Sequence, residues 1–123
     1  MILVDTSVWI DHLRAGNVVL ERLLNSAGVL GHPFVIGELA LGNLRQRNVV
    51  LGALRQLPQA VVASDDEVLV FIGDSPLFGR GIGYIDAHLL AAARLTPDAR
   101  LWTRDRRLRR VAAGLDLAAA LPA

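Results

Sequence analysis

Short apolar runs alternate along this chain with longer segments of helical periodicity. The first run, residues 2–4, is Ile-Leu-Val, and it leads into Asp5-Thr6-Ser7, which suits the start of a helix. Further strands are expected at residues 29–32, 60–63 and 100–103, with an edge strand at 115–117. Strands that alternate with helices are joined by right-handed crossovers. The pattern therefore predicts an α/β fold, a three-layer α/β/α domain with a central parallel sheet of four to five strands.

Capping and helix-stopping residues mark the expected helices. Ser64 and Glu67 fit a capping box, and Pro33 suits the first turn of a helix. The one clear loop is the glycine-rich segment 73–83. Helices are expected after residue 5, at 18–26, 33–44 and 48–56, from 65 onward, and at 84–95 and 105–113. No repeat or linker interrupts this order, so residues 1–123 are predicted to form one domain.

Composition narrows the class of protein. Hydrophobic residues make up 53% and charged residues 20% of the chain, which is too apolar for disorder and too rich in charge for a membrane protein. No apolar run is long enough to cross a bilayer and no signal peptide is visible, so a cytoplasmic protein is expected. Cysteine is absent, which excludes disulfides, thiol catalysis and thiolate metal sites. Carboxylates and three histidines remain as strong metal ligands.

Four acidic residues are expected at one end of the sheet. Asp5 follows the first strand, Glu38 lies on the helix after the second, Asp86 opens the helix after the glycine-rich loop, and Asp105 follows the strand at 100–103. In open parallel sheets, functional sites lie beyond the carboxyl ends of the strands. We therefore expect these four side chains to converge.

Three of the four acids also have purely structural interpretations. Asp5 suits a helix cap, Asp86 suits the N-terminus of a helix, and Asp105 suits a partner for the neighbouring arginines. Glu38 is harder to explain in this way, because it lies in the apolar segment 34–41, where a buried carboxylate needs a partner or a metal ion. The chain has no lysine to neutralise a carboxylate cluster, so the pattern favours a site for Mg²⁺ or Mn²⁺.

Four segments resemble, in the same order, the motifs of VapC-type PIN domains. They are MILVDTSVWIDHLR, VIGELALG, GYIDAHLLAAA and LWTRDRRLRR, and together they extend over essentially the whole chain. The resemblance implies a PIN-like parallel-sheet nuclease that holds one or two divalent ions with three or four acids and cuts single-stranded or looped RNA. It assigns the catalytic, metal-binding tetrad to Asp5, Glu38, Asp86 and Asp105.

The activity that the resemblance implies is hydrolysis of RNA phosphodiesters by the toxin of a VapBC-type toxin–antitoxin pair. A metal ion lowers the pKa of a bound water and stabilises charge on the attacked phosphate, so no protein nucleophile is required. Ser7 and Thr103 flank the acids and are expected to orient ligands or water, with helix capping and strand termination as their alternative roles. The expected partners are RNA, a VapB-like antitoxin and a second copy of the chain in a homodimer.

All 13 basic residues are arginines, and five of them lie between residues 104 and 110. Arg104, Arg106 and Arg107, together with Arg80 in the glycine-rich loop, are candidates for contact with RNA phosphates or with an acidic antitoxin. A charge run on a surface helix is also commonly just solvated. The three histidines have no metal-ligand spacing and are predicted to be structural or exposed.

Other classes of protein fit this pattern less well. A receiver-type phosphoacceptor domain requires a lysine near its acidic pocket, and this chain has none. A haloacid-dehalogenase-type phosphatase requires a second aspartate two residues after Asp5, where this chain has Ser7. Two alternatives stay open, namely a stand-alone PIN nuclease in RNA processing and a PIN-like module that binds RNA or protein without cutting. The presence of all four acids favours cleavage.

Overall fold

The computed structural model describes residues 1–121, and its centre is a parallel sheet of three strands. These are β1 (Ile2–Val4), β2 (Val29–Leu30) and β3 (Arg100–Trp102), in the order β2-β1-β3. Ile2 of the central strand lies opposite both Val29 and Arg100. The last two residues of the predicted domain 1–123 lie outside the described part of the chain.

Helices cover both faces of this sheet. Successive side chains of a strand point to opposite faces. Leu3 and Val4 of β1 are fully buried, and Leu101 and Trp102 of β3 are nearly so. Burial on both faces places the sheet between two layers of helices. The predicted α/β class with a parallel sheet is therefore confirmed.

Seven helices lie within residues 1–121. They are α1 (Thr6–Ala15), α2 (Val18–Asn25), α3 (Pro33–Ala40), α4 (Arg47–Gln56), α5 (Asp65–Asp74), α6 (Tyr84–Leu95) and α7 (Arg106–Gly114). Pro33 occupies the first turn of α3, and the capping box of Ser64 and Glu67 is present at the start of α5, as the sequence predicts. None of these helices is long and apolar enough to cross a membrane.

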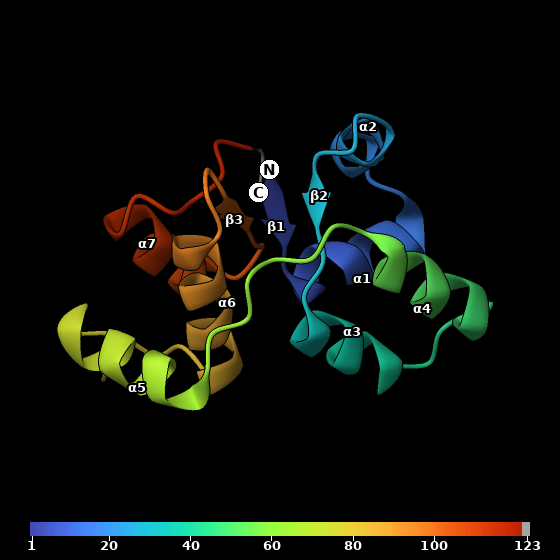
Figure 1. The fold of residues 1–123 in the computed structure, drawn as a ribbon. Coiled ribbons are helices and arrows are strands. Elements are labelled where there is room, and N and C mark those ends of the chain that lie inside the picture. Colours follow the sequence, from blue (N-terminus) through green and yellow to red (C-terminus); the bar gives the residue numbers. More distant parts are fainter. Residues whose placement is uncertain (122–123) are drawn as a thin grey trace.

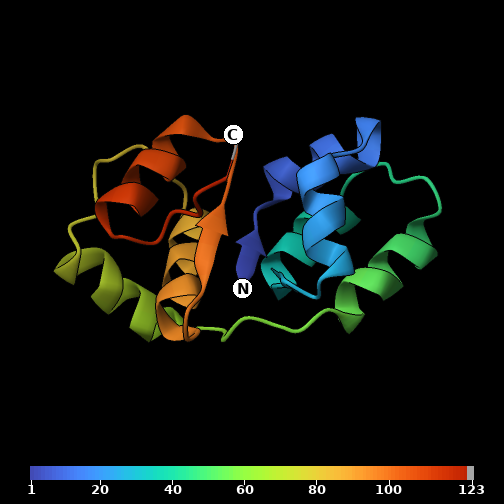
Figure 2. The same cartoon turned by 90° about the horizontal axis from the view of Figure 1, so that it is seen from above.

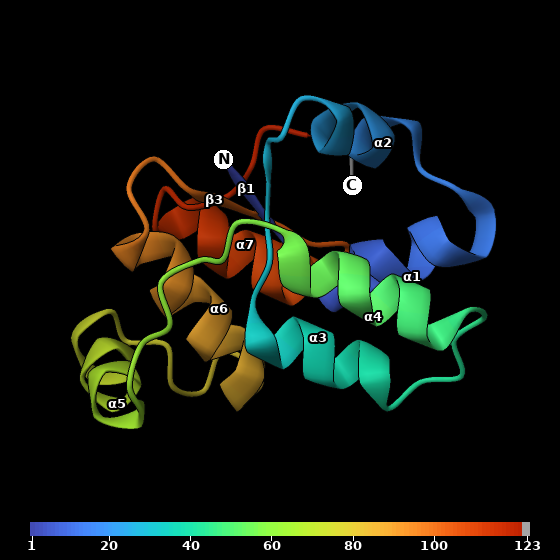
Figure 3. The same cartoon turned by 45° about the vertical axis from the view of Figure 1, so that its right-hand side comes forward.

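The helices form two groups. Helices α1 to α4 gather on the β2 side of the molecule, and α5 to α7 gather on the β3 side (Figures 1 and 2). The turned view shows α3 and α4 running side by side, while α5 packs against α6 (Figure 3). Helix α6 also packs against β3, and its Leu89 and Leu90 are fully buried in the core. The central strand β1 thus joins the two groups of helices.

Two of the expected strands are wrong, and the sheet has three strands rather than four to five. At residues 60–63, the N–H of Ala60 donates to Gly31 O at 2.9 Å, but the next N–H, that of Val61, donates to Thr96 Oγ1 at 2.8 Å. The chain therefore leaves the ladder after one residue, and only an isolated bridge between Gly31 and Gln59 remains. The expected edge strand at 115–117 is likewise reduced to a bridge between Leu101 and Ala118. The helix expected at 33–44 ends at Ala40.

Candidate functional site

Asp5 lies directly after the central strand and is buried, with 7% of its surface exposed. Although it occupies the N-cap position of α1, its side chain makes no capping hydrogen bond. Its Oδ2 instead accepts two hydrogen bonds of 2.7 Å, one from Ser7 Oγ and one from Thr103 Oγ1. No described residue donates to its other oxygen, Oδ1. The structure therefore presents one oxygen of a firmly held carboxylate.

The hydroxyls that hold Asp5 also join two strand ends. Ser7 Oγ accepts the N–H of Arg104 at 3.0 Å, and Thr103 Oγ1 accepts the N–H of Asp105 at 3.0 Å. The Ser7–Arg104 bond and the Thr103–Asp5 bond connect the segment after β1 to the segment after β3. Thr103 is 2% exposed, so its hydroxyl is in a nearly dry environment, where such hydrogen bonds are strong.

Glu38 lies on α3, half-buried, and faces the start of α1. Its Oε1 accepts a hydrogen bond of 2.7 Å from Thr6 Oγ1. Because α1 packs against α3, this bond brings Glu38 towards the helix that begins immediately after Asp5. The sequence argument missed Thr6. The sequence Asp5-Thr6-Ser7 indicated that polar side chains gather at the start of a helix. It could not show that Thr6 contacts Glu38, because that contact depends on how α1 and α3 pack.

Asp86 lies in the first turn of α6, and its Oδ2 accepts the N–H of Gly83 at 3.1 Å. Burial raises the pKa of its carboxyl above the ordinary value, the Gly83 hydrogen bond lowers it, and the charges of Asp5, Asp105 and Glu38 raise it further. The helix-terminus interpretation of Asp86 is therefore correct but incomplete. Three other carboxylates lie close enough to act on it.

Asp105 is exposed and caps α7, because its Oδ1 accepts the N–H of Leu108 at 2.9 Å. Within residues 1–121 no arginine forms an ion pair with it. Arg104, its direct neighbour, instead pairs with Asp11 of α1, with Nη1 and Oδ2 2.7 Å apart. The structure thus replaces the proposed arginine partner of Asp105 with a helix cap.

The four predicted acids therefore come to one region, beyond the carboxyl ends of β1 and β3. The charges of Asp5, Asp105 and Glu38 all raise the pKa of Asp86, so these three carboxylates lie near its carboxyl. In the described part of the chain, no three of them converge tightly enough to hold one ion in their present rotamers. The donor set nevertheless suits a hard cation, since it consists of carboxylate oxygens with no lysine nearby.

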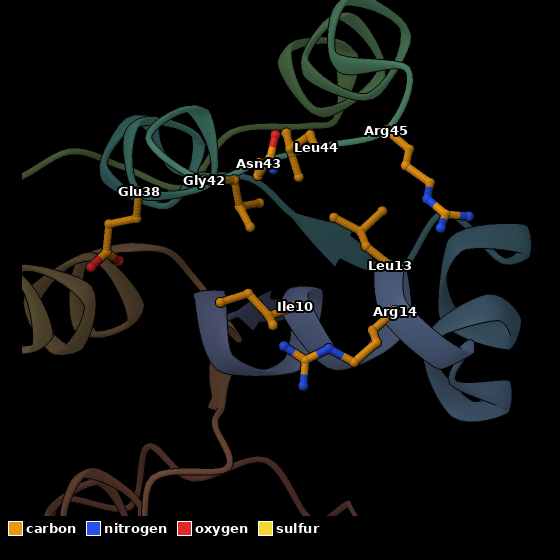
Figure 4. A pocket seen from close by; sticks show the side chains of 9 residues that line it. Ile10, Leu13, Arg14, Glu38, Gly42, Asn43, Leu44 and Arg45 are labelled. Atoms are coloured by element: carbon orange, nitrogen blue, oxygen red, sulfur yellow. The ribbon is translucent and has the colours of Figure 1, made fainter.

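A pocket of about 510 Å³ extends away from Glu38 between α1 and the segment after α3. Ile10 and Leu13 of α1 face Leu44 across it, with Glu38 at one end and Arg45 at the other (Figure 4). Its floor is aliphatic and contains no aromatic ring, so it offers no platform for stacking a base.

The candidate arginines differ in their surroundings. Arg104 is engaged by Asp11, as described above. Arg80, Arg106 and Arg107 are exposed and form no ion pair with any residue in 1–121. Three of the four candidate arginines are therefore exposed without an ion pair in this part of the chain, and Arg104 is partly neutralised.

His32 and His88 form a buried pair around Phe34. His32 and His88 are 0% and 1% exposed, and the ring of Phe34 contacts both, at centroid distances of 5.2 and 4.6 Å. His32 Nδ1 accepts the N–H of Phe34 at 3.0 Å and so caps α3, but its Nε2 has no partner among the described residues. Burial, and secondly the nearby His88, lower the pKa of His32 from 6.5 to about 4. The structural role predicted for the histidines holds for this pair.

Comparison with known proteins gives consistent results. A family described as the PIN domain matches residues 2–114, a span that includes all four acids. The chain is also similar to "Ribonuclease VapC32" of Mycobacterium tuberculosis, in both strain CDC 1551 / Oshkosh and strain ATCC 25618 / H37Rv. In each case 54% of residues are identical over 109 residues, which cover 89% of this chain and 88% of the relative. The resemblance to the VapC type is thereby confirmed, and the chain belongs to the PIN-domain family.

Proposed function

We propose that this protein is a Mg²⁺- or Mn²⁺-dependent endoribonuclease that hydrolyses RNA phosphodiesters. The observation that carries the proposal is the gathering of four carboxylates at the carboxyl ends of the parallel strands, where the charges of three act on the fourth. The names of the relatives, both ribonucleases, support the same reaction.

In this proposal Asp5, Glu38, Asp86 and Asp105 hold one or two divalent ions. Such an ion supplies a bound water of lowered pKa and stabilises charge on the attacked phosphate. The carboxylates need to turn towards one another to bind it, since no three of them converge tightly enough in the described residues. Asp5 is the fixed member, because two hydroxyls hold its Oδ2 and leave Oδ1 for a ligand.

Ser7 and Thr103 act as positioning residues. Each donates to Asp5 and each accepts a backbone N–H from the segment after β3, so they keep the carboxylate and the start of α7 in register. Thr6 does the same for Glu38. Groups that orient metal ligands in this way commonly change metal affinity or activity 10- to 100-fold, as an order of magnitude, when removed.

The test is cleavage of a single-stranded, loop-containing RNA by the purified chain in Mg²⁺ or Mn²⁺ and in excess chelator. We expect cleavage only with the metal, and none from Asp5→Asn or Asp86→Asn, both folded by circular dichroism. Glu21→Gln removes one exposed acid from α2 and serves as the matched control, expected to cleave as wild type does. Full activity in chelator would contradict the metal mechanism.

We further propose that the protein is the toxin of a toxin–antitoxin pair, with a VapB-like antitoxin and a homodimeric state. Several large apolar side chains are exposed, as expected of a chain that forms interfaces; they include Leu41, Val49, Leu69, Val70 and Phe78. A neighbouring short gene for a DNA-binding partner, and growth arrest relieved by its co-expression, would distinguish a toxin from a stand-alone nuclease. Light scattering that shows only monomer at micromolar concentration counts against the homodimer.

A further inference from the structure

Arg107 lies directly against the backbone of Gly81. A Cβ built on Gly81 would lie 2.9 Å from Arg107 Nη1 and 3.1 Å from its Cδ, so the arginine side chain would have to shift to accommodate it. Gly81 also has a φ of +79°, in the left-handed region that favours glycine. The absence of a side chain at residue 81 therefore makes room for the arginine.

This contact connects two segments that carry site acids. Gly81 lies two residues before Gly83, whose N–H is bound by Asp86. Arg107 lies two residues after Asp105, whose charge acts on Asp86. The Arg107 side chain thus packs on the loop that leads to Asp86, from the helix that Asp105 caps.

Arg107 shares its lack of an ion pair with Arg106, and differs from it in lying against Gly81. Arg104 is paired with Asp11, whereas no residue in 1–121 forms an ion pair or hydrogen bond with the guanidinium of Arg107. Its side chain also packs against the backbone of Gly81. It is therefore an exposed cation with no counter-charge among the described residues.

A cation near the carboxylates would offset their repulsion of RNA. RNA is a polyanion, and four carboxylates repel it. A guanidinium attracts a phosphate and can hold two of its oxygens with parallel hydrogen bonds. We propose that Arg107, seated on Gly81, binds one phosphate of the RNA next to the carboxylate cluster and so positions the strand for cleavage. This inference rests on the proposed ribonuclease function.

The experiment measures steady-state cleavage of a single-stranded fluorophore–quencher RNA in Mg²⁺ at several KCl concentrations. Arg107→Gln is expected to raise KM roughly tenfold with little change in kcat, as expected for loss of one charged hydrogen-bonding contact. The slope of log KM against log salt should also fall by about one, the signature of one lost phosphate contact. Arg107→Lys keeps the charge and should recover part of the affinity. Arg22→Gln, an exposed arginine of α2, is the charge-matched control and should leave KM unchanged.

The glycines provide a second matched pair. Gly79 and Gly81 both have positive φ, 72° and 79°, so alanine strains the backbone at either position. Only at Gly81 does the added Cβ meet Arg107, since nothing lies within 4 Å of one at Gly79. Gly81→Ala should therefore raise KM, and Gly79→Ala should not.

The outcomes separate this inference from the function on which it rests. Wild type that cleaves while Arg107→Gln keeps its KM and salt slope overturns the role of Arg107 alone. An equal rise in KM for Gly79→Ala and Gly81→Ala overturns the role of the contact between Gly81 and Arg107. If Arg107→Gln weakens only binding of an acidic peptide, the residue serves a protein partner and the inference is wrong. Wild type that cleaves no RNA in any divalent metal overturns both proposals.

Discussion

Asp5 and His32 follow the neighbouring strands β1 and β2, and both are buried. They differ in the hydrogen bonds that their polar atoms receive. Two hydroxyls donate to Asp5 Oδ2, whereas His32 Nε2 has no partner among the described residues. A buried charge persists only when hydrogen bonds or counter-charges support it, and an unsupported group stays neutral. The Asp5 region is therefore built to keep a charge, and the His32 region to exclude one.

The largest expected effect is the loss in the free energy of unfolding when low pH favours protonation of His32. The pKa of His32 is about 4 in the folded chain, below the ordinary 6.5, so between these values the unfolded chain binds a proton that the folded chain does not. Stability from this group is thus complete above pH 6.5 and is lost as the pH falls towards 4. The loss amounts to about 3 kcal/mol. Urea unfolding of wild type across this pH range measures it.

His32→Asn is the control for that measurement. Asparagine keeps an acceptor for capping α3 but does not titrate. Its free energy of unfolding should be lower than that of wild type at pH 7 and should change less between pH 6.5 and 4. Parallel curves for the two proteins would show that other groups cause the acid sensitivity.

The next largest effect on the free energy of unfolding comes from removing a hydrogen-bond donor to Asp5. Thr103→Val replaces a buried hydroxyl that donates to Asp5 and accepts the N–H of Asp105. We expect a loss of about 2 kcal/mol in the free energy of unfolding, because a buried carboxylate loses a donor. Thr103→Ser keeps the hydroxyl and should lose less. If serine and valine destabilise equally, the methyl packing of Thr103 matters and its hydrogen bonds do not.

Much of the Asp5 region could be predicted from the sequence, because its information is local. An apolar run followed by Asp-Thr-Ser marks the end of β1 and the start of α1, and a lone glutamate in an apolar helix marks Glu38. The rule for parallel sheets then brings the acids to one end. These inferences need no knowledge of how helices pack against one another.

The rest depends on contacts between distant segments, which local patterns do not encode. The expected strand at 60–63 fails because Val61 donates to the side chain of Thr96, 35 residues away. The pairing of Thr6 with Glu38 depends on packing of α1 against α3. The ring cluster of His32, Phe34 and His88 likewise needs α3 and α6 side by side.

The smallest expected effect tests the central claim, that the four carboxylates form a cation site. Asp86→Asn keeps the size of the side chain and its acceptor for Gly83 while removing one charge from a cluster whose members repel. The raised pKa of Asp86 means that its ionised form opposes folding near neutral pH. In chelator, the variant should therefore be more stable than wild type by about 1 kcal/mol, a Tm rise of roughly 3 to 6 °C.

Thermal melts of wild type and Asp86→Asn, first in chelator and then in millimolar Mg²⁺, are the most direct measurement. An ion that binds only the folded state stabilises it by about 2.7 kcal/mol at a hundredfold excess over its dissociation constant. We predict that Mg²⁺ raises the Tm of wild type more than that of the variant. If the variant melts at or below wild type in chelator, and Mg²⁺ shifts both equally, then Asp86 only caps its helix and the carboxylates are not a cation site.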